Sequence, residues 1–287
     1  MNERKNRTAS FAPSEFDEQY LKWINNALKN ADFKNSNEVV RSEGPLSPLL
    51  FISFVPRSGS TYLAQLLARS GGFQFVSNFI ARFWMVPEVG FFLQRQIGLD
   101  GLAPKATDVA SSQFGVGDHP LDPHEFGFFW RRFIPEQETD YLSKPYDEKV
   151  VADLRKSINF LRAVNKKPLF FKNCLAGYNY EFIKHCFPDA KFIVLKREEE
   201  AVISSILAAR LRLYGNESIW FSLKPKDFHA IINSGLNGRG EVESQVHSIS
   251  KHLDGLLDEY SNDVFEIEYE SIVSAPEEII ESVVSFL

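Results

Sequence analysis

Residues 49–62, LLFISFVPRSGSTY, join a run of apolar, β-prone residues to a proline, an arginine, a glycine and several hydroxyl residues. The uninterrupted apolar run over 49–55 has the length of a strand and indicates a strand that is buried on both faces. A helix over residues 60–69, ended by Gly71 and Gly72, is expected to follow. The segment therefore predicts a central strand, a short loop and a helix that begins at the loop.

Strand-like and helix-like segments alternate along the rest of the chain. Further strands are predicted at 73–76, 168–173, 190–197 and 263–270, and further helices at 14–31, 178–187, 198–214, 241–260 and 275–287. Such alternation predicts an α/β fold with a mainly parallel sheet that helices cover on both sides. Folds of this kind bind ligands beyond the carboxyl ends of the strands, where helices begin.

The length of the chain suits one large domain, which we place at residues 45–287. Residues 1–44 are interpreted as an N-terminal extension that holds a single helix. Five apolar residues of this helix recur at helical spacing and form one stripe, which is expected to pack on the core: Phe16, Tyr20, Trp23, Ile24 and Leu28.

The net charge of −6 is unevenly distributed, because residues 241–287 hold twelve acidic residues and one lysine. An anionic ligand therefore meets a more favourable field in the first part of the chain. No basic run is typical of nucleic-acid binding, and no window approaches the roughly 18 apolar residues of a membrane span. With no signal-peptide pattern at the start, the sequence predicts a cytoplasmic protein. Cys174 and Cys186 form no CxxC pair, so no disulfide framework or metal cluster is expected.

The loop PRSGST has the residue types of an anion site. It follows a buried strand and presents backbone N–H groups at a helix N-terminus, where the helix dipole adds positive charge. Gly59 lets the backbone approach an anion, and Arg57 supplies a permanent charge with forked donors. Ser58, Ser60 and Thr61 supply hydroxyl groups. The alternative is structural, with Ser60 or Thr61 capping the helix and Arg57 in solvent.

An ATP-binding P-loop would need GxxxxGK followed by Ser or Thr, which is not present here. The loop instead resembles the 5'-phosphosulfate-binding loop of sulfotransferases that use 3'-phosphoadenosine 5'-phosphosulfate (PAPS). That family also places an Arg at the end of a later strand and a Ser eight residues on, and the pair binds the 3'-phosphate. The segment FIVLKREEEAVISSIL supplies Arg197 and Ser205 at this spacing. A weaker similarity is IEYESIVSAPEEIIESVVSFL, which resembles the family's Tyr-Glu and closing helix.

The resemblance implies a P-loop nucleotide-kinase-like sulfotransferase fold. It also implies transfer of a sulfuryl group from PAPS, as co-substrate, to a hydroxyl acceptor, with no metal required. Arg57 matches the position that stabilises the leaving phosphate, and Tyr62 matches a position whose ring can stack on adenine. A buried core aromatic is the alternative for Tyr62. The residues matched to the 5'-phosphate site are Ser58, Gly59, Ser60 and Thr61.

Two features depart from the family pattern. Glu198, Glu199 and Glu200 stand where the family commonly has Asp-Pro-Arg/Lys, and at a helix N-terminus we expect them to face solvent. The sequence also ends at SFL, where relatives usually continue into a loop that touches the cofactor. Either Arg239 supplies that contact or the chain is shortened.

The acceptor hydroxyl needs a general base. Small-molecule members of the family use the His of a Lys-Thr-His segment, whereas the corresponding stretch here is FFKNC. Lys172 is expected to assist the sulfuryl oxygens, and Cys174 is interpreted as a small core residue.

The base is therefore sought in the aromatic middle of the chain, in PHEFGFFWRR, which also resembles a motif in a bacterial branch of the family. Partial desolvation beside the aromatic residues favours Glu125 over His124 as the base. Alternatively, both are surface residues at a helix cap. Glu88 is the reserve candidate. The remaining histidines are interpreted as surface or capping residues: His119, His185, His229, His247 and His252.

The acceptor is the least determined element of the prediction. The 26 phenylalanines suit either an aromatic pocket or a plain core, so the acceptor hydroxyl can belong to a small molecule, a lipid or a carbohydrate.

Two other functions are alternatives to sulfotransfer. One is a kinase or other nucleotide phosphotransferase, which the missing GK and the Arg197/Ser205 pair argue against. The other is a catalytically silent module that binds the nucleotide.

Overall fold

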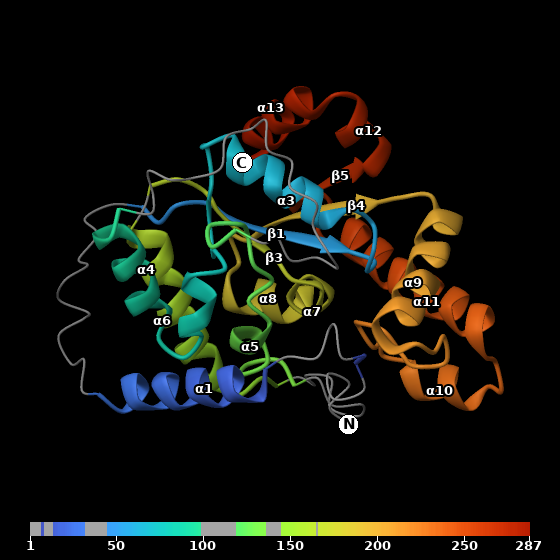
Figure 1. Ribbon diagram of the computed structural model, residues 1–287. Coiled ribbons are helices and arrows are strands. Elements are labelled where there is room, and N and C mark those ends of the chain that lie inside the picture. Colours follow the sequence, from blue (N-terminus) through green and yellow to red (C-terminus); the bar gives the residue numbers. More distant parts are fainter. Residues whose placement is uncertain (1–6, 9–13, 32–44, 99–118, 136–144, 165) are drawn as a thin grey trace.

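The computed structural model describes residues 7–8, 14–31, 45–98, 119–135, 145–164 and 166–287 (Figure 1). Within them, five parallel strands form one sheet with the order β2-β3-β1-β4-β5. The strands are β1 (Leu49–Phe54), β2 (Gln74–Phe75), β3 (Leu169–Lys172), β4 (Lys191–Lys196) and β5 (Val264–Glu268). The predicted α/β fold with a mainly parallel sheet is confirmed, and each strand lies within the segment predicted for it.

Helices precede, separate and follow the strands. They are α1 (Glu15–Asn30), α3 (Ser60–Arg69), η3 (Ile80–Phe83), α4 (Pro87–Gln96), α5 (Gly127–Trp130), α6 (Glu148–Val164), α7 (Cys174–Tyr178), α8 (Tyr180–Cys186), α9 (Glu199–Tyr214), α10 (Phe228–Asn233), α11 (Gly238–Glu259), η5 (Ser261–Asp263), α12 (Tyr269–Ser274) and α13 (Pro276–Phe286). The bounds of α3 are those predicted. None of the helices in the described residues is long and apolar enough to cross a membrane.

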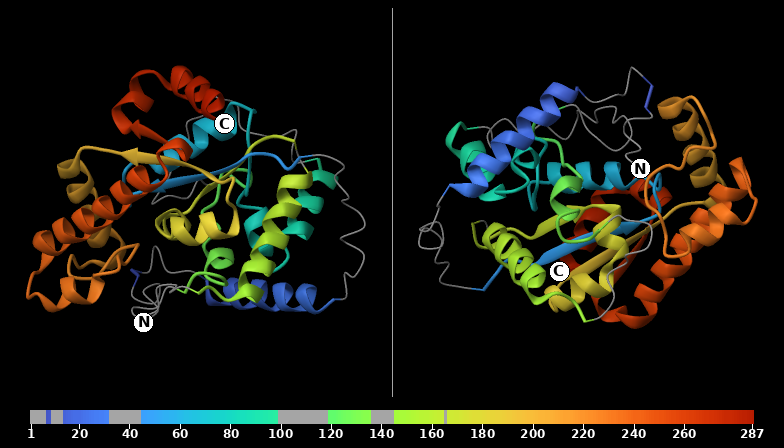
Figure 2. Two further views of the ribbon diagram at one scale, coloured as in Figure 1. Left: turned by 180° about the vertical axis from the view of Figure 1, so that it is seen from behind. Right: turned by 90° about the horizontal axis from the view of Figure 1, so that it is seen from below.

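Alternate residues of β1 enter two separate apolar clusters on the two faces of the sheet. Leu50 and Ile52 pack with residues of α3, α12 and α13. Leu49 and Phe51 pack with residues of α6, α8 and α11. Figures 1 and 2 show these helices as layers on opposite sides of the strands. All six residues of β1 are buried, as the uninterrupted apolar run predicted.

Three of the five residues in the predicted apolar stripe of α1 do not pack on the core, whereas Ile24 and Leu28 are half-buried. Phe16, Tyr20 and Trp23 are 75%, 53% and 63% exposed, whereas Asn25 on the other side of the helix is fully buried. The Asn25 amide donates to Arg82 O at 2.7 Å and accepts from Met85 N at 2.9 Å. The helix docks through this polar contact because the amide satisfies two backbone groups at η3 that would otherwise be buried without partners.

A buried arginine joins the two long helices beyond β4. Arg210 of α9 has no exposed surface, and its guanidinium donates to Glu241 Oε1 at 2.5 Å and to Gln245 Oε1 at 3.3 Å, both on α11. It also donates to Glu217 O at 3.0 Å, in the segment that follows α9. The segment after α9 is therefore fixed to both helices, since breaking this network would leave a buried charge unpaired.

The sequence suggested a surface or capping role for His252. The structure instead packs its ring against two tyrosine rings. Its ring on α11 lies 4.1 Å from the Tyr178 ring and 4.9 Å from the Tyr180 ring, centroid to centroid. Its Nε2 lies 2.8 Å from Tyr178 O, and because a carbonyl can only accept, Nε2 carries the proton. Burial lowers the pKa of His252, and the nearby Lys226 charge adds to this effect, while the hydrogen bond to Tyr178 O opposes it.

This environment predicts a pH-dependent stability. A lowered pKa in the folded state means that the unfolded chain binds a proton first, so stability is present above pH 6.5 and falls as the pH drops below it. We predict that the thermal unfolding midpoint declines less between pH 7.5 and 5 in His252→Gln, which keeps a neutral donor, than in the unchanged protein. The exposed His247→Gln is the matched control. An equal decline in all three proteins would contradict the role of His252.

Candidate functional site

The carboxyl end of β1 continues into a tight loop with unusual backbone geometry. Arg57 has φ of 76° and Gly59, the N-cap of α3, has φ of 92°. A positive φ at an arginine is uncommon and is found preferentially where function requires it. Ser58 is buried, its N–H donates to Val55 O at 3.1 Å, and its hydroxyl donates to the same carbonyl at 2.7 Å. The loop is therefore folded back on the strand, with α3 beginning directly behind it.

A tyrosine that sequence reasoning did not single out packs against this loop. A Cβ atom at Gly59 would lie 2.2 and 2.4 Å from ring atoms of Tyr269, so no side chain fits there unless the ring moves. Tyr269 is the first residue of α12, directly after β5. The guanidinium of Arg197 lies over the same ring, 4.4 Å from its centroid. The resemblance of the segment IEYESIVS to the family's Tyr-Glu pattern could have pointed to Tyr269, but no role was assigned to this residue from the sequence.

The two predicted phosphate motifs meet in space. Arg57 Nε donates to Ser205 Oγ on α9 at 3.1 Å, and Arg197, just beyond β4, donates to Arg57 O at 3.1 Å. Burial lowers the pKa of Arg57, and the positive charge of Arg197 adds to this effect, while Glu125 opposes it. Arg197 Nε is buried and has no hydrogen-bond partner in the described part of the chain. Two neighbouring arginines with an unused donor fit an anionic group.

Lys172 and Glu125 form the other side of the site. Lys172, the last residue of β3, is 2% exposed, and its Nζ donates to Thr61 Oγ1 at 3.1 Å. The same Nζ lies 3.2 Å from Glu125 Oε1. Asn173, also missed by sequence reasoning, donates to Glu125 O at 2.9 Å and caps α7 by accepting from Ala176 N. Glu125 is thereby held next to the loop by two adjacent residues of β3 and α7.

The two other candidates for the base are placed differently. His124 Nδ1 accepts from Phe126 N at 2.8 Å, so this nitrogen supports the backbone where Phe126 adopts φ of 55°. Glu88 lies in the first turn of α4, on the side of the domain away from the tip of β1 (Figure 1). Burial raises the pKa of Glu88, and Lys156 and Arg132 oppose it. None of the residues that perturb Glu88 belongs to the loop.

The acidic residues after Arg197 face solvent, as predicted. Glu198, Glu199 and Glu200 are exposed, and the Glu198 side chain caps α9 by accepting from Glu200 N and Ala201 N. Arg239, at the start of α11, donates to both carboxylate oxygens of Glu200. These charges are therefore balanced by a helix N-terminus and by an arginine.

Three further residues from the sequence analysis are buried or half-buried. Tyr62 is half-buried against the apolar cluster of α3, α12 and α13. Ser60 is buried in the first turn of α3. Cys174 is half-buried, and its Sγ lies 4.0 Å from Ser222 Oγ, where Ser222 has φ of 69°. Ser222 belongs to the segment that follows α9, so this segment lies beside the end of β3.

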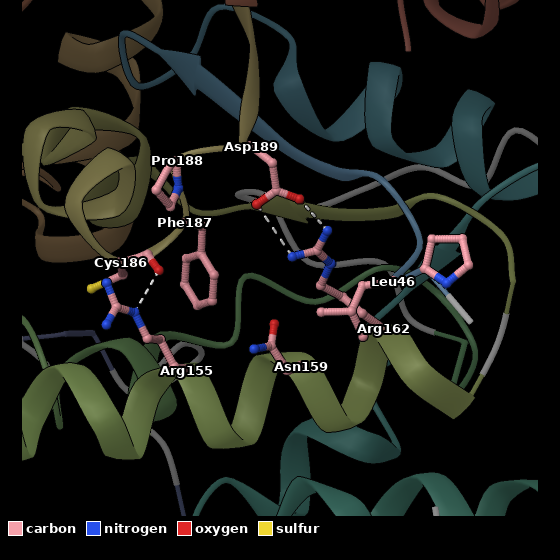
Figure 3. A pocket seen from close by; sticks show the side chains of 9 residues that line it. Leu46, Arg155, Asn159, Arg162, Cys186, Phe187, Pro188 and Asp189 are labelled. Carbon is pink, nitrogen blue, oxygen red and sulfur yellow. Dashed lines mark hydrogen bonds and ion pairs between the residues drawn. The ribbon is translucent and has the colours of Figure 1, made fainter. Parts of the chain in front are cut away.

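A cavity of about 450 Å³ lies at the opposite edge of the sheet (Figure 3). Its walls include Leu46, just before β1, and Asp189, just before β4, so it faces the amino ends of the strands. The ion pair between Arg162 and Asp189 crosses one side of it. None of the motif residues lines this cavity. Within the described residues no group of three or more His, Cys, Asp or Glu side chains is placed to hold a metal ion.

A parallel sheet with an anion-type loop between its central strand and the following helix, and with Arg57 and Arg197 meeting at that loop, defines an α/β protein of the P-loop-like class. The sequence profile of the sulfotransferase family matches residues 48–287, and the chain belongs to that family.

Solved structures are similar in fold. A sulfotransferase from Mycobacterium tuberculosis H37Rv, STF1, has a TM-score of 0.57 at 12% identity, over 95% of this chain and 76% of that one. A sulfotransferase from Mycobacterium avium, STF9, has a TM-score of 0.53 at 15% identity, over 95% of this chain and 73% of that one. No curated protein shows significant sequence similarity to this chain.

The contact between Gly59 and Tyr269 predicts a specific stability difference. Gly59→Ala and Gly71→Ala both place a side chain at positive φ, but a Cβ at Gly71 meets nothing within 4 Å. Gly71→Ala should therefore cost about 1 kcal/mol in free energy of unfolding, from backbone strain alone. Gly59→Ala should cost at least about 1 kcal/mol more, because the Tyr269 ring must move. Urea unfolding measures both values, and equal costs would contradict the contact.

Proposed function

We propose that the protein transfers a sulfuryl group from PAPS to a hydroxyl acceptor. The family supports sulfotransfer in general, and the observation that carries the donor is the convergence of Arg57, Arg197 and Ser205 at one helix N-terminus. These residues suit a ligand with two separate anionic groups, which PAPS has and inorganic sulfate lacks. The buried, unpartnered Nε of Arg197 supplies a donor for one of them.

Each part of the loop has a distinct role in this proposal. The hydroxyls and backbone N–H groups of Ser60 and Thr61 hold the 5'-phosphate, with Gly59 allowing close approach, while Ser58 shapes the loop through its two hydrogen bonds to Val55 O. Arg197 and Ser205 hold the 3'-phosphate. Arg57, between them, stabilises the negative charge that develops on the leaving phosphate oxygen. The other product is 3'-phosphoadenosine 5'-phosphate.

Glu125 is the general base of the proposal. The bond from the acceptor oxygen to sulfur forms as the bond from sulfur to the phosphate oxygen breaks, and the acceptor proton passes to the Glu125 carboxylate. Lys172 contacts both Glu125 and Thr61. Its charge can therefore stabilise the sulfuryl oxygens while the group moves from the phosphate, near Thr61, to the acceptor, near Glu125. His124 is the weaker candidate because its Nδ1 already accepts a backbone hydrogen bond.

The burial of the aromatic residues in the middle of the chain removes one argument for an apolar acceptor. Phe126, Phe129, Trp130 and Phe133 are all buried members of the main apolar cluster. They serve as core, so the aromatic content does not by itself favour an apolar acceptor. We keep a small-molecule, lipid or carbohydrate hydroxyl as the acceptor class, and the assay below uses pools of all three.

The test is sulfate transfer from radiolabelled PAPS to pooled hydroxyl acceptors, without added metal. Arg57→Ala should lower kcat by roughly 100- to 1000-fold, as loss of an electrostatic stabiliser does. Glu125→Gln should lower kcat by roughly 100-fold or more with little change in the KM for PAPS. His124→Gln, its neighbour, should stay within a few-fold of the unchanged protein.

Three outcomes would count against the proposal. Full activity in Glu125→Gln with loss in His124→Gln would move the base to His124. Phosphate transfer from ATP with magnesium, in place of sulfate transfer, would identify a kinase. Tight binding of PAPS with no transfer to any pool would favour a silent nucleotide-binding module.

A further inference from the structure

A row of exposed aromatic rings lies along one face of α1. Phe16, Tyr20 and Trp23 are spaced four and three residues apart, so they share one side of the helix. The ring centroids of Phe16 and Tyr20 are 6.1 Å apart, and those of Tyr20 and Trp23 are 5.7 Å apart. All three are more than half exposed. We call them the α1 aromatic row. Contiguous exposed apolar surface of this kind marks an interaction site.

The α1 aromatic row is held in a fixed orientation. Asn25, on the opposite side of the helix, is fully buried and bonded to Arg82 O and Met85 N. Ser14 caps the helix by accepting from Asp17 N at 3.2 Å. Rotating the helix to bury the rings would break both Asn25 bonds and leave buried backbone groups unsatisfied. The exposure is thus imposed by the docking of α1, so a partner meets a preformed surface.

The charges of α1 select the partner. Glu15, Asp17 and Glu18 lie in the first turn, whereas Lys22 lies near the middle of the helix and Lys29 in its last turn. An antiparallel copy of the same helix would set the acidic first turn of each against the lysines of the other. In the antiparallel register that sets Phe16 against Trp23, Lys22 lies two residues from the position opposite Glu15 and on the same flank of the row, within reach of its long side chain. A parallel arrangement would oppose like charges.

We propose that α1 is the contact through which two copies of this chain associate, with the two helices antiparallel and their aromatic rows packed together. Such a contact is self-complementary, as a two-fold interface must be. A helix of 16 residues spans about 24 Å and offers less than the roughly 800 Å² per partner of a stable interface. The dimer is therefore in equilibrium with the monomer at about micromolar concentrations. Helix α1 lies at the outer edge of the domain, away from the tip of β1 (Figures 1 and 2), so its pairing leaves the loop open.

Sedimentation velocity of the full chain over a range of concentrations tests the proposal. The unchanged protein should shift from the mass of one chain to that of two. Phe16→Ser with Trp23→Ser should remain at one chain mass throughout, with an unchanged thermal unfolding midpoint. Val284→Ser, which alters a 56% exposed residue on α13, is the control and should still dimerise. One chain mass for the unchanged protein at all concentrations overturns the proposal, as does a dimer in the double variant.

Two further measurements test the geometry. Lys22→Glu should weaken the dimer at least tenfold, and Glu15→Lys in the same chain should restore it; failure to restore it overturns the antiparallel register.

Of the four tryptophans, Trp84, Trp130 and Trp220 are buried, so iodide quenching of fluorescence reports on Trp23. Quenching should decrease as the dimer forms. Unchanged quenching in a dimeric sample overturns the proposal, as does binding to anionic lipid vesicles that competes with dimerisation.

Discussion

Two positively charged side chains meet at the tip of the central strand, and the surrounding structure depends on that meeting. Burial lowers the pKa of Arg57, and the positive charge of Arg197, which donates a hydrogen bond to Arg57 O, lowers it further. A loop that bends to φ of 76° at Arg57 is needed to bring them together, and α9 supplies Ser205 to hold Arg57. Tyr269 packs on both Gly59 and Arg197. An anion bound here would offset a cost already present in the fold.

The opposite side of the site depends on an ion pair between Lys172 and Glu125. Lys172 reaches from the end of β3 to Thr61 on the loop and to Glu125 on the segment before α5. One lysine thus joins the anion loop to the proposed base, at the edge where the carboxyl ends of parallel strands meet. The chain has no histidine in the FFKNC segment, and this arrangement gives a physical reason why a carboxylate can replace it. Sulfuryl transfer needs positioning and charge stabilisation more than a particular basic group.

Much of the fold could be predicted from the sequence because it depends on patterns within short segments. The apolar run of β1, the small residues of the loop and the eight-residue interval from Arg197 to Ser205 all lie within single elements or adjacent ones. The failures came where partners are distant in sequence. The burial of Asn25 depends on backbone groups of η3, so the apolar stripe of α1 pointed to the wrong face. The Tyr269 contact with Gly59 and the ring packing of His252 likewise require the assembled sheet.

We propose that two anion sites lie side by side at this edge of the sheet, and removing one phosphate from the ligand distinguishes them. Calorimetry without magnesium would compare 3'-phosphoadenosine 5'-phosphate with adenosine 5'-phosphate, which lacks only the 3'-phosphate. The unchanged protein should prefer the bisphosphate by roughly 100-fold, as charge-assisted hydrogen bonds imply, and Arg197→Met should lose most of this preference. Equal affinity for the two nucleotides, or an unchanged preference in Arg197→Met, would contradict it.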